Sequence, residues 1–167
     1  MFGLEMKEYR VLFVCHGNIC RSPMGEAILK KMVNDTDPEI RFHIESAAVS
    51  REEIGNPIYP PAKRCLSGHN IPFDNGKTAR QVESADYCRF DLIVCMDEWN
   101  VRLLKRIIPS DPMRKIRLMM SFAGQSRDVA DPWYTGDFEK TYQDLALGCK
   151  ALLNQIMQDG SPALQNG

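Results

Sequence analysis

The sequence predicts an α/β fold, a three-layer α/β/α arrangement built on a four-stranded parallel sheet with a ligand-binding loop directly after the first strand. Two observations predict it. Short, continuous apolar runs alternate along the chain with stretches whose apolar residues recur at helical spacing. Such alternation is typical of a parallel sheet that helices cover on both faces. In addition, a conspicuous polar loop separates the first apolar run from the first helical stretch, and ligands of such folds bind beyond the carboxyl ends of the strands.

Four segments are predicted to be strands. Continuous apolar runs predict three buried strands at Val11–Val14, Leu92–Met96 and Ile116–Met120. A fourth run, Ile40–Ile44, alternates in polarity and predicts a strand with one more exposed face. Because crossovers between parallel strands are right-handed, few topologies remain, and we expect the first strand to be central.

Four segments are predicted to be helices. Pro23 suits the first turn of a helix, and Ser22 before it is expected to act as the N-cap. Shorter helices are predicted at Pro60–Ser67 and Glu98–Ile108. The last helix is predicted by one apolar stripe, whose members are Phe138, Tyr142, Leu145, Cys149, Leu152 and Ile156.

Length and composition predict a single domain over residues 1–167, with a core from about 8 to 158 and a flexible tail at 159–167. The formal net charge of −1 gives no global attraction to nucleic acid or to an anionic membrane. No apolar run approaches the roughly 18 residues of a membrane span, and the first ten residues lack the layout of a signal peptide. We therefore expect a cytoplasmic protein whose six cysteines are core residues or reactive thiols rather than disulfides.

The loop after the first strand has the composition of an anion site. It consists of Cys15, His16, Gly17, Asn18, Ile19, Cys20, Arg21, Ser22 and Pro23. A loop of this length between a strand and a helix can turn its backbone N–H groups inward, and the positive end of the helix strengthens the resulting cradle. Gly17 allows an unusual backbone conformation, and the planar guanidinium of Arg21 can bind two phosphate oxygens.

Cys15 is expected at the floor of this cradle. Electropositive sites lower the pKa of a thiol from near 8.5 to about 3.5–7.5, so the field that binds phosphate also favours the attacking thiolate. A hydroxyl at Ser22 can hydrogen-bond that thiolate. The predicted product of the first step is a phosphocysteine on Cys15. A lone cysteine at a strand end would more often be a packing residue, but the spacing Cys-x5-Arg-Ser-Pro meets the geometric demand of phosphate chemistry.

These residues resemble the signature loop of the low-molecular-weight protein-tyrosine phosphatases. The resemblance extends from about Glu8 to Met157 through separated segments, namely Val11–Met24, Glu26–Ala27, Ser46–Ala48, Ile54–Pro57, Ala79–Gln81, Cys95–Glu98 and Asp131–Tyr134. It implies that Asp131 is the general acid, and such an acid typically contributes about 10²–10⁴-fold to the rate. Pro132 stiffens this loop, and Trp133 and Tyr134 can form a wall of the pocket.

The resemblance also implies supporting roles. Asn18 and Ser46 match positions that hold the phosphate loop in shape, and His69 resembles a histidine that tunes the site through the same network; a surface residue at a helix end is the alternative for His69. Cys20 is implied to bond with Cys15 under oxidation. His16 lies at a variable position, so its side chain has no assigned role. No cofactor and no metal are implied, and a zinc site at Cys15, His16 and Cys20 lacks a second ligand pair.

Three other functions are compatible with parts of this pattern. An arsenate reductase of this fold needs a thiol seven residues after the position of Cys95, where this chain has Arg102. A protein-arginine phosphatase resembles the loop but carries Thr in place of Ile19. A non-enzymatic phosphate-binding module is disfavoured by Cys15, Arg21 and Asp131 together.

The expected partner is a phosphotyrosine protein or a small aryl phosphate, and the protein is expected to be a monomer or a weak dimer through Trp133 and Tyr134. One departure from the family concerns substrate choice. Where members often carry an aromatic pocket wall, this chain has Arg51, Glu52 and Glu53. An acidic rim of this kind disfavours acidic phosphopeptides.

Overall fold

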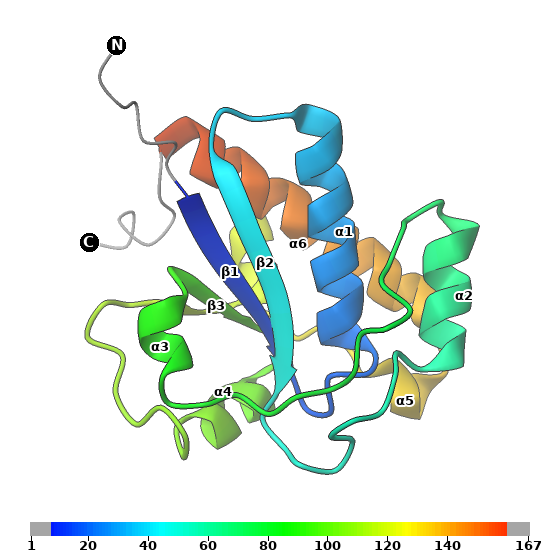
Figure 1. Cartoon of the computed structure of the whole chain (residues 1–167), viewed down its shortest axis with the longest axis horizontal. Helices are drawn as coiled ribbons and strands as arrows, with labels where there is room; N and C mark the ends of the chain where they lie inside the picture. Colours follow the sequence, from blue (N-terminus) through cyan, green and yellow to red (C-terminus); the bar gives the residue numbers. More distant parts are fainter. Residues whose placement is uncertain (1–7, 160–167) are drawn as a thin grey trace.

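A four-stranded sheet forms the centre of the computed structural model, which describes residues 8–159. Its strands are β1 (Glu8–Cys15), β2 (Arg41–Ala48), β3 (Leu92–Cys95) and β4 (Ile116–Leu118). All neighbours are parallel and the order is β2-β1-β3-β4 (Figure 1), so the predicted central position of the first strand is confirmed. The register pairs Cys15 with Ala48 and Val14 with Cys95. The carboxyl ends of these three strands therefore meet at one edge of the sheet.

Helices cover both faces of the sheet, which confirms the predicted three layers (Figure 1). They are α1 (Arg21–Thr36), α2 (Pro60–Gly68), α3 (Asp86–Arg89), α4 (Glu98–Leu104), α5 (Pro132–Thr135), α6 (Phe138–Asp159) and the 3₁₀ helix η1 (Met119–Ala123). Alternate residues of β1 point to opposite faces. Val11 and Phe13 join a core cluster with residues of α1 and α6, whereas Leu12 and Val14 join a second cluster with Leu104 of α4.

Some predicted element boundaries are wrong. β2 runs on to Ala48 because it pairs residue for residue with β1. β4 ends at Leu118, since Met119 and Met120 turn into η1 and are fully buried. α4 ends at Leu104 rather than Ile108. The predicted tail lies outside the described residues, apart from Asp159 at the end of α6.

Ser22 is not the cap of α1. The helix begins at Arg21 with Cys20 in the N-cap position, and no side chain caps it. The hydroxyl of Ser22 is instead directed at the thiol of Cys15 and the amide of Asn18. The N-terminal N–H groups of α1 are thereby left facing the loop, as an anion cradle requires.

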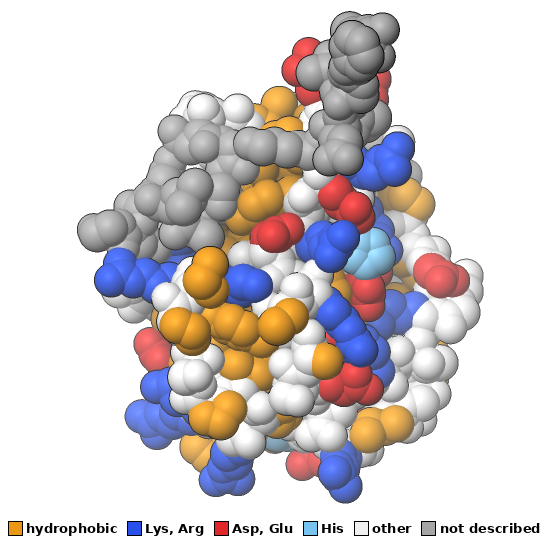
Figure 2. Space-filling model, turned by 60° about the vertical axis from the view of Figure 1, so that its left-hand side comes forward, with side chains coloured by type: hydrophobic (Ala, Val, Ile, Leu, Met, Phe, Trp, Pro, Cys, Tyr) orange, Lys and Arg blue, Asp and Glu red, His pale blue; other side chains and the backbone are white. Residues whose placement is uncertain are grey.

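Charged side chains of both signs are interspersed on the face shown in Figure 2. On the side of α3 they form ion pairs, such as Arg80 with Asp86 at 3.0 Å and Arg89 with Glu83 at 2.9 Å. Arg89 and Glu83 are both exposed, so their pair contributes little to stability. Asp86 is fully buried, so its carboxylate depends on the pair with Arg80 to offset the cost of burial. Within residues 8–159, no helix is long and apolar enough to cross a bilayer.

Candidate active site

Cys15 is the last residue of β1, and its thiol lies beneath the first turn of α1. The sulfur lies 3.0 Å from Ser22 Oγ and accepts hydrogen bonds from the backbone N–H groups of Asn18 at 3.3 Å and Ser22 at 3.4 Å. Cys15 is 3% exposed. Two backbone N–H groups and one hydroxyl thus surround a single sulfur. The strand-to-helix junction thus places hydrogen-bonding groups of the loop around the thiol of Cys15.

Asn18 fixes the shape of the loop from within. Its φ of 62° lies in the left-handed region, which Asn adopts more readily than most residues. Gly17 does not have a positive φ, so the expectation that Gly17 supplies the unusual conformation is wrong. A Cβ at Gly17 would instead lie 3.2 Å from the side chain of Glu53, and its lack of a side chain leaves room at the pocket rim.

The amide of Asn18 is fully buried and is bonded on both sides. Its Nδ2 donates to Ser22 Oγ at 2.8 Å and to Ser46 Oγ at 2.9 Å. Its Oδ1 accepts from the backbone N–H of Arg80 at 3.2 Å and from Lys77 Nζ at 3.3 Å. Ser46 in turn donates to Glu26 Oε1 at 2.6 Å. The predicted partnership of Asn18 and Ser46 is present as a continuous buried network.

Arg21 is held by acidic and carbonyl oxygens around its guanidinium. Nη1 donates to Asp97 Oδ2 at 2.6 Å and to the Val129 carbonyl at 2.8 Å, and Nη2 lies 3.4 Å from Asp131 Oδ2. Burial works to lower the pKa of Arg21, but Cys15, Asp97 and Asp131 together raise it above its ordinary value. The guanidinium of Arg21 is therefore permanently charged, and its contacts fix its orientation.

Asp131 lines the same pocket as Cys15 and lies directly before α5. Its Oδ1 accepts from the backbone N–H of Trp133 at 3.0 Å, so the carboxyl caps this one-turn helix. Pro132 at the first helical position presets the turn. The sequence Asp-Pro-Trp therefore positions one carboxylate oxygen through local contacts, and the other oxygen is directed toward Arg21.

One pocket gathers these groups. It is lined by Cys15, His16, Gly17, Ile19, Cys20, Arg21, Glu52, Glu53, Asp131, Trp133 and Tyr134. Trp133 and Tyr134 are 52% and 84% exposed, as expected for a rim. Tyr59 packs against Trp133 with ring centroids 4.8 Å apart, which supports that wall from behind.

Comparison with known proteins agrees with this geometry. Residues 10–162 match the family model described as low molecular weight phosphotyrosine protein phosphatase. The human low molecular weight phosphotyrosine protein phosphatase is 41% identical over 158 residues, which are 90% of this chain and 98% of that protein. The chain belongs to the low-molecular-weight phosphotyrosine protein phosphatase family.

Solved structures of this phosphatase family superpose closely on the chain. The crystal structure of YfkJ from Bacillus subtilis has a TM-score of 0.87 at 36% identity and covers 94% of this chain and 99% of its own. A Drosophila arginine phosphatase has a TM-score of 0.81 at 29% identity, with 89% and 98% covered. The fold thus accommodates proteins named for two different phosphorylated residues.

Two histidines of this phosphatase-family chain lie outside the catalytic network. His16 is at the rim, where its Nε2 lies 3.1 Å from Glu52. His69 follows α2 and bonds Glu139 on α6, while its ring stacks on Tyr142. The expectation that His69 joins the network of Asn18 and Ser46 is therefore wrong, because its hydrogen bonds point toward α6 instead.

Sequence reasoning assigned no role to several residues of the site. Asp97 orients Arg21, Glu26 holds Ser46, and Lys77 donates to Asn18 Oδ1. Burial lowers the pKa of Lys77 from its ordinary value. Asp97 could have been found, because it follows the carboxyl end of the strand next to β1.

Proposed function

We propose that the protein hydrolyses aryl phosphate monoesters, phosphotyrosine above all, through a phosphocysteine intermediate. The observation that carries this proposal is the position of the Cys15 sulfur beneath three hydrogen-bond donors in a pocket that Arg21 and Asp131 also line. Nucleophile, anion cradle and acid are thereby within reach of one bound phosphate.

In the first step, the Cys15 thiolate attacks phosphorus and the bond to the aryl oxygen breaks. Backbone N–H groups of the loop and Nη2 of Arg21 stabilise the equatorial oxygens of the transition state. Asp131 gives its proton to the departing oxygen, which leaves as a phenol. In the second step, Asp131 takes a proton from water as water attacks the phosphocysteine, and Ser22 stabilises the departing Cys15 thiolate.

Pocket walls support an aromatic substrate. Trp133 and Tyr134 flank the opening and Ile19 lines its side, so a phenyl ring can pack between apolar surfaces. Glu52 and Glu53 also line the pocket. Their charge repels acidic flanking residues, so a phosphotyrosine peptide with basic neighbours should have a lower KM than one with acidic neighbours.

The deciding experiment measures phosphate release from an aryl phosphate at mildly acid pH, with a chelator present. Cys15→Ser should abolish turnover, and Asp131→Ala should reduce it by about 10²–10⁴-fold. Cys88→Ser and Asp128→Ala are matched controls, since both residues are exposed and neither lines the pocket. Unaltered turnover by Cys15→Ser would exclude the phosphocysteine mechanism. Faster hydrolysis of phosphoarginine than of phosphotyrosine would exclude phosphotyrosine as the preferred substrate.

Cys20 is proposed to protect the nucleophile. It is 5% exposed and lines the pocket with Cys15, and burial raises the pKa of its thiol above the ordinary value. Peroxide would oxidise the Cys15 thiolate to a sulfenic acid, and Cys20 sulfur would displace water to form a disulfide. Activity after peroxide and then a reductant should recover in the wild type, and recovery should fall in Cys20→Ser.

We also propose that the protein works in a reducing cytoplasm and that it is a monomer or a weak dimer. All six cysteines are free thiols, which suits a reducing compartment. The exposed rings of Trp133 and Tyr134 could support weak self-association. Sedimentation at high concentration should then detect dimers in the wild type and fewer in Trp133→Ala; equal behaviour of both would exclude this surface.

A further inference from the structure

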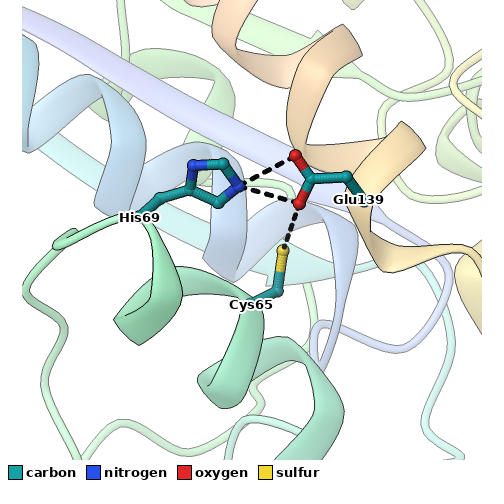
Figure 3. A group of neighbouring side chains, drawn as sticks. All are labelled: Cys65, His69 and Glu139. Atoms are coloured by element: carbon teal, nitrogen blue, oxygen red, sulfur yellow. Dashed lines mark hydrogen bonds and ion pairs between the residues drawn. The ribbon is translucent and has the colours of Figure 1, made fainter.

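A second cluster of reactive side chains lies away from the phosphate pocket, between α2 and α6. Cys65 and His69 are four residues apart at the end of α2, and Glu139 is in the first turn of α6 (Figure 3). One ligand atom from each lies within 4.8 Å of the others. Within residues 8–159, this is the one group of three or more Cys, His, Asp or Glu residues so arranged.

The donor set suits a zinc ion. Zinc combines thiolate sulfur at about 2.3 Å with imidazole nitrogen and carboxylate oxygen at about 2.0–2.2 Å, in tetrahedral geometry. These lengths place neighbouring ligand atoms about 3.3–3.6 Å apart. The structure has His69 Nε2 at 2.8 Å from a Glu139 oxygen and Cys65 Sγ at 3.9 Å from the same oxygen. Rearrangements on the order of 1 Å would therefore admit the ion.

Neighbouring groups hold the ligands in place. The His69 ring stacks on Tyr142 with centroids 3.6 Å apart and an interplanar angle of 11°. When the ion binds, the Cys65 thiol would release its proton and with it the hydrogen bond that it donates to the Phe138 carbonyl at 3.5 Å. Gln143 Nε2 donates to Glu139 Oε1 at 2.8 Å. Such outer contacts orient metal ligands. Side-chain exposures of 29% for His69 and 58% for Glu139 leave the cluster open to an entering ion.

We propose that Cys65, His69 and Glu139 bind one zinc ion, with solvent as the fourth ligand, and that the ion fastens α2 to the first turn of α6. This bridge would affect the pocket wall, because Tyr59 directly precedes α2 and packs on both Trp133 and Phe138. A metal bridge between α2 and α6 supports the pocket wall from behind without touching the reacting atoms.

The test titrates zinc into full-length, metal-free protein by calorimetry, with a phosphine reductant in place of thiols. Cys15→Ser serves as the background, so that the active-site thiol cannot bind the metal. One ion per chain is expected, with a rise in Tm of ~5 °C or more at a hundredfold excess over Kd. Cobalt(II) should give a thiolate charge-transfer band in the same protein.

Two variants in that background decide the outcome. Cys65→Ser should weaken zinc binding at least ~100-fold and remove the cobalt band, whereas Cys88→Ser, which changes an exposed thiol outside the cluster, should leave both unchanged. His69→Gln provides a second ligand deletion, and circular dichroism checks that each variant is folded. Equal zinc affinity of folded Cys65→Ser and Cys88→Ser overturns the proposal. So does a cobalt band that survives in Cys65→Ser.

Discussion

Replacing Asn18 tests whether the phosphate loop is held by a side-chain network, by backbone conformation, or by both. Asn18→Ala removes four hydrogen bonds, but some of the groups that lose a bond keep another partner. Ser46 keeps its bond to Glu26, and Ser22 keeps its contact with Cys15. The backbone N–H of Arg80, by contrast, donates to Asn18 Oδ1 and loses that acceptor.

The expected magnitude follows from two separate contributions. One buried donor left without a partner costs about 1–3 kcal/mol. An alanine at a φ of 62° costs a further 1–2 kcal/mol or so, whereas glycine at the same φ is unstrained. Asn18→Ala should therefore lose roughly 2–5 kcal/mol of unfolding free energy, and Asn18→Gly roughly 1–3 kcal/mol.

Urea unfolding followed by tryptophan fluorescence measures both variants on one scale. The comparison is informative because both substitutions delete the same amide and differ only in the backbone contribution. If Asn18→Gly is as unstable as Asn18→Ala, the left-handed strain argument is refuted. If both match the wild type, the network does not stabilise the fold, and its role is confined to the shape of the pocket.

Three further perturbations test other contacts. Ser22→Ala should lower kcat about 10–100-fold, because a hydrogen bond to a charged sulfur is worth about 1.5–3 kcal/mol; steady-state kinetics measures this. Gly148→Ala should cost about 1–3 kcal/mol in urea unfolding, since its Cβ would lie 2.6 Å from the end of the Met119 side chain and 3.2 Å from that residue's carbonyl oxygen. Gly68→Ala, which meets nothing within 4 Å, is the matched control and should be neutral or slightly stabilising. Asp144→Asn should destabilise the protein at neutral pH but progressively less below pH ~4, measured by unfolding across pH.

The sign of the last effect follows from the ion pair. Hydrogen bonds from Arg127, at 2.8 Å to each carboxylate oxygen, lower the pKa of Asp144 in the folded protein. The stabilisation is therefore complete above the unfolded pKa and disappears as pH falls through the folded one. A difference between wild type and Asp144→Asn that persists at the lowest pH would contradict this. An unchanged kcat in Ser22→Ala would contradict the expectation for Ser22. Equal stability of Gly148→Ala and Gly68→Ala would contradict the expectation for Gly148.

The sequence predicted the sheet and the loop because both depend on local pattern. The run Val11–Val14 is continuous and apolar, and Cys15 and Arg21 lie at a spacing that one loop spans. The second half of β2 escaped prediction because Glu45–Ala48 has no β-branched or aromatic residue. Its strand conformation comes from pairing with β1 instead.

Residues that act through long-range contacts were the hardest to predict. Lys77 lies 59 positions from Asn18, and Asp97 lies 76 positions from Arg21. Composition cannot select such partners, since 22 acidic and 21 basic residues compete for the assignment. Ser22 was predicted correctly in one respect and wrongly in another. Its contact with the Cys15 sulfur is present, but its local signal for a helix cap was misleading, because the amide of Asn18 also binds its hydroxyl.

The arrangement around Arg21 has a consequence for the order of events in turnover. The Nη2 side of its guanidinium faces Asp131, whereas the Nη1 side is bonded to Asp97 and to the Val129 carbonyl. A phosphate that enters the pocket brings two negative charges to the Nη2 side of Arg21. This is the side whose partner, Asp131, can be replaced by another anion. We expect the carboxylate of Asp131 to yield this place to the phosphate, because both anions compete for the same edge of the guanidinium. Substrate binding would in this way separate Asp131 from Arg21 before any bond of the substrate breaks, while Asp97 and the Val129 carbonyl keep the guanidinium in its orientation.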